Sequence, residues 1–295
     1  MNKIKFRAVR DVGSTIDVTI QFLRQNFSII SRSIFFIAIP FLLVGALLYS
    51  GIYIIQNSFS TESDVIYFLG VFITVMLIIL YFFSIFPIIY EYMYLYQKSE
   101  DFRQITVSAV RKRVASRILS YIGNAFLIFF LSITVYVFGS LVTGLLMAID
   151  IAVGAFGVFL FLCLLAYVSI AFSLIYAINL FEDVSFGIAL NRSFYLLKGH
   201  FFTTFGLYIT AFFISLSVTI IPSSSLPVLV EFLGTTFGIN YSEVVVILLG
   251  FLYSFILLVV ISVTLTASLF RYFSLVEGKE AMGAQEAIEQ IGVGR

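Results

Sequence analysis

The sequence predicts an all-α polytopic membrane protein with six transmembrane helices and three amphipathic interfacial helices. Hydrophobic residues make up 61% of its 295 residues and charged residues only 11%, whereas a soluble domain averages about 25% charged residues. The apolar residues gather in six runs, each close to or above the roughly 20 residues that a helix needs to cross hydrocarbon. All 17 Lys and Arg residues lie outside these runs, which supports the same fold class.

The first third of the chain predicts an interfacial helix and two spans. Apolar residues recur at helical spacing behind a capping Ser14: Ile16, Ile20, Leu23, Phe27 and Ile30. We expect spans at residues 34–55, bent by Pro40, and at residues 65–90, with a polar loop over 56–64. Four tyrosines crowd the exit of the second span, and we interpret them as an interfacial belt rather than a binding cage: Tyr90, Tyr92, Tyr94 and Tyr96.

The second third repeats this order. Residues 101–116 form an amphipathic segment with one apolar edge and one strongly basic edge, which carries Arg111, Lys112 and Arg113. Spans are expected at residues 118–143 and 154–180. Asp150 is the only charged residue between the two spans, so we place the turn there.

The last third begins with the clearest amphipathic helix, predicted from Asp183 to Gly199. Acids at its start and Lys198 at its end suit the helix dipole, and Gly199 suits a left-handed cap. Its apolar residues are spaced by four, four, three and four: Phe186, Leu190, Phe194, Leu197 and Phe201. Spans follow at 202–221, ended by Pro222, and at 244–270. The apolar stretch 226–237 between them is too short to cross.

This layout predicts a single helical membrane domain over residues 1–270 and a cytoplasmic tail over residues 271–295. The domain divides into three units, 14–90, 101–180 and 183–270, for which duplication and independent origin remain equally open. Positive residues near spans stay in the cytoplasm. The loops on one side contain only acids and all 17 cations lie on the other, so both termini are expected inside.

Few side chains suggest chemistry. His200 is the only histidine and Cys163 the only cysteine; we interpret them as a helix-end cation and a packed thiol. We find no nucleotide, hydrolase or metalloprotease motif and expect no catalytic residue, cofactor or metal. The candidate contacts to anionic lipid headgroups or to a partner are the residues Arg111, Lys112, Arg113, Arg192, Ser193 and Lys198, although anchoring alone would also explain them. A contact between Arg192 and Glu182 or Asp183 requires the helix start to fold back.

Three patches of the chain form a recognisable set: Ala189–Ser193 with Lys198, Gly199 and Phe201, the segment Val12–Phe27, and Arg271–Phe273 with Glu277 and Gly278. Together they resemble the membrane domains of bacterial and archaeal glycerophosphodiester phosphodiesterases and related integral membrane families. About 25 residues follow the last predicted span, so no phosphodiesterase domain is expected. Free-standing members of this group look like subunits of larger bacterial membrane systems, some of them encoded near MoxR-type ATPases.

We therefore predict a non-catalytic subunit or scaffold of a membrane protein complex in a bacterial inner membrane. Its expected partners are anionic lipids at the cytoplasmic face and other membrane proteins, but not nucleic acid. The alternative is a transporter or lipid-handling protein for uncharged or amphipathic molecules, because the predicted spans contain no ionisable residue. That alternative predicts a cavity lined by Asn124, Ser132 and tyrosines. An intramembrane enzyme is a distant third.

Overall fold

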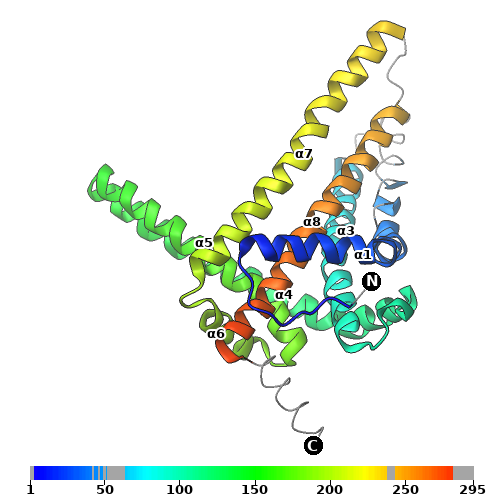
Figure 1. The fold of residues 1–295 in the computed structure, drawn as a ribbon. Coiled ribbons are helices and arrows are strands. Elements are labelled where there is room, and N and C mark those ends of the chain that lie inside the picture. Colours follow the sequence, from blue (N-terminus) through cyan, green and yellow to red (C-terminus); the bar gives the residue numbers. More distant parts are fainter. Residues whose placement is uncertain are drawn as a thin grey trace, which may run out of the picture. The chain divides into compact units, whose positions relative to one another are not determined.

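The computed structural model describes residues 3–41, 43–45, 47, 48, 51, 64–237 and 243–281, and the side chains of these residues except 64–67, 82 and 221–256. This described part is helical and contains no strand (Figure 1). Its elements are α1 (Val12–Ile37), α3 (Asp64–Lys98), the 3₁₀ helix η1 (Phe102–Gln104), α4 (Val107–Ile149), α5 (Ile151–Glu182), α6 (Phe186–Leu197), α7 (Phe201–Phe237) and α8 (Glu243–Glu280).

Six helical segments of the described residues are long and apolar enough to cross a membrane, which confirms the predicted fold class. They are Val12–Gly45, Phe68–Lys98, Val107–Ile149, Ile151–Glu182, Phe201–Ile220 and Leu257–Glu280. The predicted loop over 56–64 falls, except for Asp64, outside the described residues, as does the chain beyond 281. Only the third interfacial helix is separate, as α6; the basic segment is continuous with the span in α4.

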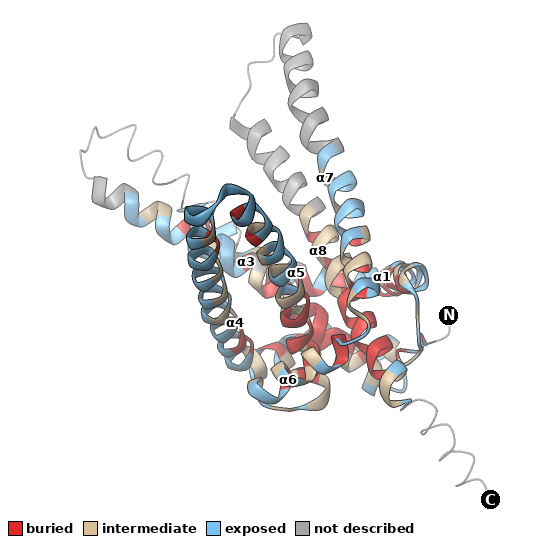
Figure 2. Cartoon of the chain, turned by 90° about the vertical axis from the view of Figure 1, so that its left-hand side faces the viewer, coloured by how far each residue is buried: buried red, intermediate tan, exposed pale blue. Residues whose placement is uncertain are grey.

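The chain forms two compact units. One consists of Met1–Phe22 and Leu119–Arg295, and the other of Leu23–Ile118. In the first unit, α5, α6, α7 and α8 pack against one another. In α5, most buried positions lie between residues 170 and 180, near α6, whereas the α4–α5 hairpin is largely exposed (Figure 2).

The turn of this hairpin lies where the sequence predicts it. Asp150 caps α5, because its carboxylate accepts hydrogen bonds from the backbone of Ala152 at 2.8 Å and Val153 at 3.2 Å. Close approach of the helices requires glycine at Gly154, where an added Cβ would lie 2.6 Å from the Cα of Met147. The hairpin is therefore tightly packed within itself.

Several helices extend beyond their predicted ends. The helix α7 continues through Pro222 to Phe237, because a proline removes one backbone hydrogen bond without necessarily ending a helix. The helix α8 continues through the predicted tail to Glu280. Its added turns bury Tyr272, Phe273, Leu275 and Val276, and this packing explains why the helix does not stop at Phe270.

Within the predicted apolar stripe of α1, Ile20 and Phe27 are 51% and 54% exposed, whereas Ile30 is buried. The polar residues Thr15, Thr19 and Asn26 are buried as well, together with Phe22. The predicted tyrosine belt is wrong: these tyrosines are largely buried within the second unit, where the Tyr92 hydroxyl donates to Asn26 Oδ1 at 2.6 Å and the Tyr96 hydroxyl to Gln25 Oε1 at 3.3 Å.

Candidate functional site

The candidate site lies in the first unit, where α5 ends and α6 begins. The helix α5 ends at Glu182, and Asp183 reverses the chain with a left-handed φ of 53°. The helix α6 then starts after Ser185 rather than at Asp183. This reversal turns the side chain of Arg192 back toward Glu182, so the contact that required a folded-back helix start is present.

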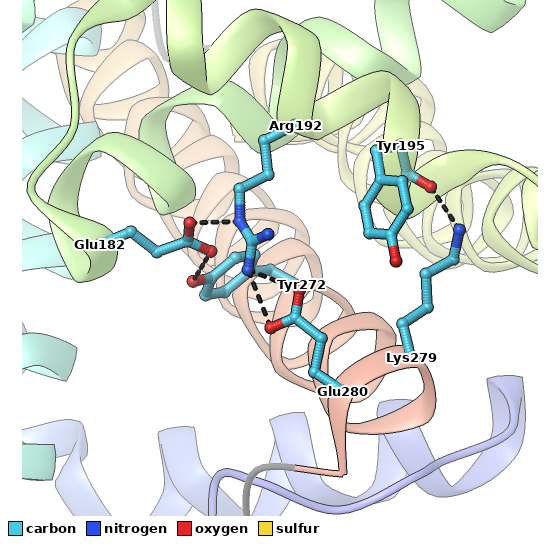
Figure 3. Close-up of polar contacts among 6 residues, drawn as sticks. All are labelled: Glu182, Arg192, Tyr195, Tyr272, Lys279 and Glu280. Atoms are coloured by element: carbon cyan, nitrogen blue, oxygen red, sulfur yellow. Dashed lines mark hydrogen bonds and ion pairs between the residues drawn. The ribbon is translucent and has the colours of Figure 1, made fainter.

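Arg192 joins three helices through a single guanidinium (Figure 3). Its Nε forms an ion pair with Glu182 of α5, and its Nη2 lies 2.8–2.9 Å from the carboxylate oxygens of Glu280 in α8. The Tyr272 hydroxyl also donates to Glu182 at 2.9 Å. We call these four residues, Glu182, Arg192, Tyr272 and Glu280, the arginine clamp.

The clamp is mostly shielded from solvent. The side chains of Arg192, Glu182 and Glu280 are only 23%, 20% and 19% exposed. Burial by itself lowers the pKa of the Arg192 guanidinium, but its hydrogen bonds and charge interactions with Glu280 and Glu182 raise the pKa above the ordinary value. The cation is therefore held in its charged state between two carboxylates.

A second contact joins α6 to the same end of α8. The Lys279 ammonium donates to the Tyr195 backbone carbonyl, and its Nζ lies 4.3 Å from the centroid of the Tyr195 ring (Figure 3). A cation over an aromatic face is attracted by the ring quadrupole. Together with the clamp, this contact fixes α6 to α8 at two places along one face.

The structure divides the six predicted contact residues into two groups. Arg111, Lys112 and Lys198 are exposed. The other three are held within the protein: Arg192 by the clamp, Ser193 by donating to the Leu190 carbonyl at 2.8 Å, and Arg113 by Glu91 at 2.5 Å. Arg113 and Glu91 both belong to the second unit.

The predicted spans contain no ionisable residue, but the helices are longer than these apolar runs and carry charged residues beyond them. The helix α3 includes Glu91, which is fully buried and forms an ion pair with Arg113; the guanidinium of Arg113 lies 3.7 Å from the centroid of the Tyr94 ring. The helix α8 includes Arg271, which is 4% exposed. Its guanidinium donates to Thr204 Oγ1 at 2.9 Å and reaches the carbonyls of Arg10 and His200.

One turn away, a chain of hydroxyls crosses α5, α7 and α8. The Tyr208 hydroxyl lies 2.6 Å from both Ser173 Oγ and Ser268 Oγ, and Ser173 donates its proton to the Ile170 carbonyl at 2.7 Å. Tyr208 must therefore donate to Ser173, and Ser268 to Tyr208.

His200 is not the helix-end cation that we expected. Burial, together with the positive charges of Arg271 and Lys279, lowers the pKa of its imidazole, so the neutral form is favoured. Gly199 does adopt the predicted left-handed conformation, with φ of 81°.

The two residues predicted to line a transport cavity differ in their exposure: Asn124 is buried and Ser132 is exposed. Cys163 is exposed rather than packed.

Among the described residues, no group of three His, Cys, Asp or Glu side chains could hold a metal ion. No protein-family model matches the sequence, and no curated protein or solved structure matches it either. The resemblance to phosphodiesterase membrane domains therefore stays a prediction. What the geometry of the site does provide is a structural connection, in which one partly buried cation holds α5, α6 and α8 together.

Proposed function

We propose that this chain is a non-catalytic subunit, or scaffold, of a larger membrane protein complex. The observation that supports the proposal best is the apolar surface of α4. Its exposed apolar side chains extend from Leu119, which is 82% exposed, to Ile149, which is 77% exposed. A surface of this kind is covered either by lipid or by another protein.

The length of this surface favours a protein partner for part of it. Thirty helical steps separate Leu119 from Ile149, which corresponds to roughly 45 Å at about 1.5 Å per residue. The hydrocarbon core of a bilayer is only about 30 Å thick. A tilt near 50° would be needed to place the whole surface in hydrocarbon, whereas transmembrane helices tilt by roughly 0–40°.

The arginine clamp also supports a role as a scaffold. By tying α6 to α5 and α8, it gives the exposed Lys198 a defined position instead of leaving it on a free helix. In our proposal, α6 lies at the cytoplasmic headgroup plane of a bacterial inner membrane and both termini are cytoplasmic, because all 17 Lys and Arg residues segregate to one side. Alkaline phosphatase fused at Arg295 should then be inactive; an active fusion would contradict this orientation.

Site-specific photocrosslinking in the native host tests the partner directly. A benzophenone amino acid at Phe138, which is 70% exposed, or at Phe126, which is 60% exposed, should form a crosslink to the same membrane protein. Tyr121, which lies on the same helix and is only 4% exposed, provides the matched control and should yield only crosslinks within the chain. Adducts with lipid alone at both exposed positions would refute the subunit proposal and would favour a lipid-handling protein.

A further inference from the structure

Arg271 is a buried cation without an acidic partner. It is only 4% exposed. Its Nε donates to Thr204 Oγ1 at 2.9 Å, and its Nη1 and Nη2 reach the carbonyls of Arg10 and His200 at 3.4 Å and 3.5 Å. These three acceptors are neutral, and no carboxylate of the described residues forms an ion pair with Arg271, whereas Arg192 has two. Because burying a charge is costly unless it is paired, the charge of Arg271 is left uncompensated.

The surroundings of Arg271 add positive charge instead of balancing it. Its contacts to Thr204 and to the His200 carbonyl place the guanidinium at the start of α7, where the helix dipole is positive. From α8, the Lys279 ammonium acts on the His200 imidazole together with Arg271, and no acid is among the charges that act on either His200 or Arg271. Arg271, Lys279 and the start of α7 thus surround His200 with positive charge.

Lys279 is not neutralised by the acid that follows it in α8. The Glu280 carboxylate is bound by Arg192 in the clamp. The Lys279 ammonium itself donates to the Tyr195 carbonyl and lies 4.3 Å from the centroid of the Tyr195 ring. Since an ammonium has three N–H donors, two of them remain for a ligand.

The turn between α6 and α7 leaves room for a ligand beside these charges. Lys198 and Gly199 are exposed, and a Cβ added at Gly199 would meet no atom within 4 Å. His200 is partly exposed, and its backbone is bonded within the chain, but no hydrogen bond joins its imidazole to another described residue. The Lys198 ammonium likewise has no partner in the described part of the chain. The turn therefore offers one cation and one imidazole N–H.

We propose that this turn binds a phosphate monoester, and we call Lys198, His200, Arg271 and Lys279 the phosphate site. A phosphate monoester carries about 1.5–2 negative charges and three strong acceptor oxygens, which suits three cations and one imidazole. In the site, Lys198, His200 and Lys279 donate to the phosphate oxygens, and the buried Arg271 acts through its charge. The phosphate of a lipid headgroup and that of a soluble ester present the same chemistry. The site requires no partner protein, so it is independent of the subunit proposal.

His200 can report on the binding, because it is the only histidine of the chain and nitrogen-15 labelling of histidine therefore gives NMR signals of this ring alone. The full chain in an uncharged detergent at pH 7 is titrated with inorganic phosphate, with chloride at equal ionic strength as the blank. A second titration uses dioctanoyl phosphatidic acid, with dioctanoylglycerol as the blank. Bound phosphate offsets the positive charges of Arg271 and Lys279, so the ring signals should move toward those of the imidazolium and saturate.

The two titrations distinguish the sources of the phosphate. Saturation with both probes supports the site and shows that a soluble phosphate group is sufficient. Saturation with phosphatidic acid alone supports it and assigns the phosphate to a lipid headgroup. If neither probe gives a saturable change beyond its blank, the proposal is overturned.

Two variants of the site and one control locate the response. Lys198→Gln and Lys279→Gln should each raise the half-saturating concentration about fivefold, the typical effect of one cation close to a phosphate. Because Lys198 is exposed and has no partner among the described residues, its replacement leaves the fold intact. Lys98→Gln removes another exposed lysine, in the second unit, and should change nothing. Equal weakening by all three replacements, as general attraction to a charged micelle would give, would overturn the site, and so would unchanged half-saturation in both site variants.

Discussion

Replacing Arg192 by glutamine should be more damaging than removing either of its acidic partners. In the clamp, one cation lies between two carboxylates, Glu182 and Glu280. The Arg192→Gln variant leaves both carboxylates facing each other without a cation. The Glu280→Gln variant instead leaves one cation and one carboxylate, which is a balanced pair.

The exposure of these side chains determines how large the loss of stability should be. Fully exposed ion pairs contribute about 0.2–1 kcal/mol, whereas breaking a fully buried pair costs about 3–5 kcal/mol. The clamp side chains are 19–23% exposed, so we expect about 2–3 kcal/mol of destabilisation for Arg192→Gln. For Glu280→Gln we expect about 1 kcal/mol, because Arg192 keeps Glu182 and part of the lost interaction is replaced by water.

The double variant distinguishes this reasoning from a simple loss of packing. Adding Glu280→Gln to Arg192→Gln removes one of the two facing carboxylates, so the double variant should be more stable than Arg192→Gln alone. Thermal unfolding in a mild detergent, followed by circular dichroism, measures all three variants against the natural protein. A double variant that is less stable than Arg192→Gln would show that repulsion between the carboxylates is unimportant and would refute the clamp as described.

Two other perturbations have equally definite outcomes. Gly154→Ala should destabilise the α4–α5 hairpin by about 1–3 kcal/mol through overpacking, whereas Gly144→Ala, which meets no atom within 4 Å, should be neutral or slightly stabilising in the same thermal assay. The free energy of unfolding should fall as the pH drops from 7 toward 5. In the unfolded chain His200 binds a proton near pH 6.5, whereas burial, Arg271 and Lys279 lower the pKa of the imidazole in the folded protein. The stabilisation from neutral His200 is therefore complete above the unfolded pKa and is lost as the pH falls through the folded pKa. His200→Asn should flatten this dependence, and an unchanged slope would refute its origin in His200.

The existence of the six spans could be predicted from the sequence, because each apolar run needs only to be long enough for hydrocarbon. The ends of the helices could not. The apolar run predicted from the sequence ends at Phe270, but the helix α8 continues, because Tyr272 and Phe273 are buried in the tertiary structure. Such contacts join segments that are far apart in the chain, and local composition does not report them.

The apolar spacing of α1 did not indicate which residues are buried inside the protein, and the reason is physical. In a soluble protein the apolar stripe of a helix faces the core. In a membrane an apolar stripe can equally well face the lipid. Helix contacts in membranes favour small and polar residues, which allow close approach and bond between helices. Thr15, Thr19 and Asn26 accordingly face inward, and Phe27 faces outward.

The candidate site could be predicted only in part. Arg192 stood out through its position on an amphipathic helix, and its contact to Glu182 required only the local chain reversal at Asp183. Its other partner, Glu280, lies 88 residues further along the chain, in a segment interpreted as a tail. A helical repeat continued past Phe270, with Tyr272, Val276 and Lys279 on one face, was the signal that could have extended α8.

The last three turns of α8 connect several other parts of the first unit. Arg271 and Ser274 hold the turn before α7 and the N-terminal residues 3–11, while Tyr272, Lys279 and Glu280 hold α5 and α6. One alanine inserted after Phe270 would rotate all of these side chains by about 100° and shift them by about 1.5 Å. We therefore expect it to lower the unfolding temperature by more than Arg192→Gln does, because every connection is lost at once. An alanine inserted after Ala281 leaves the register of these contacts intact and is the matched control; equal stability of the two insertions would show that the end of α8 does not organise the unit.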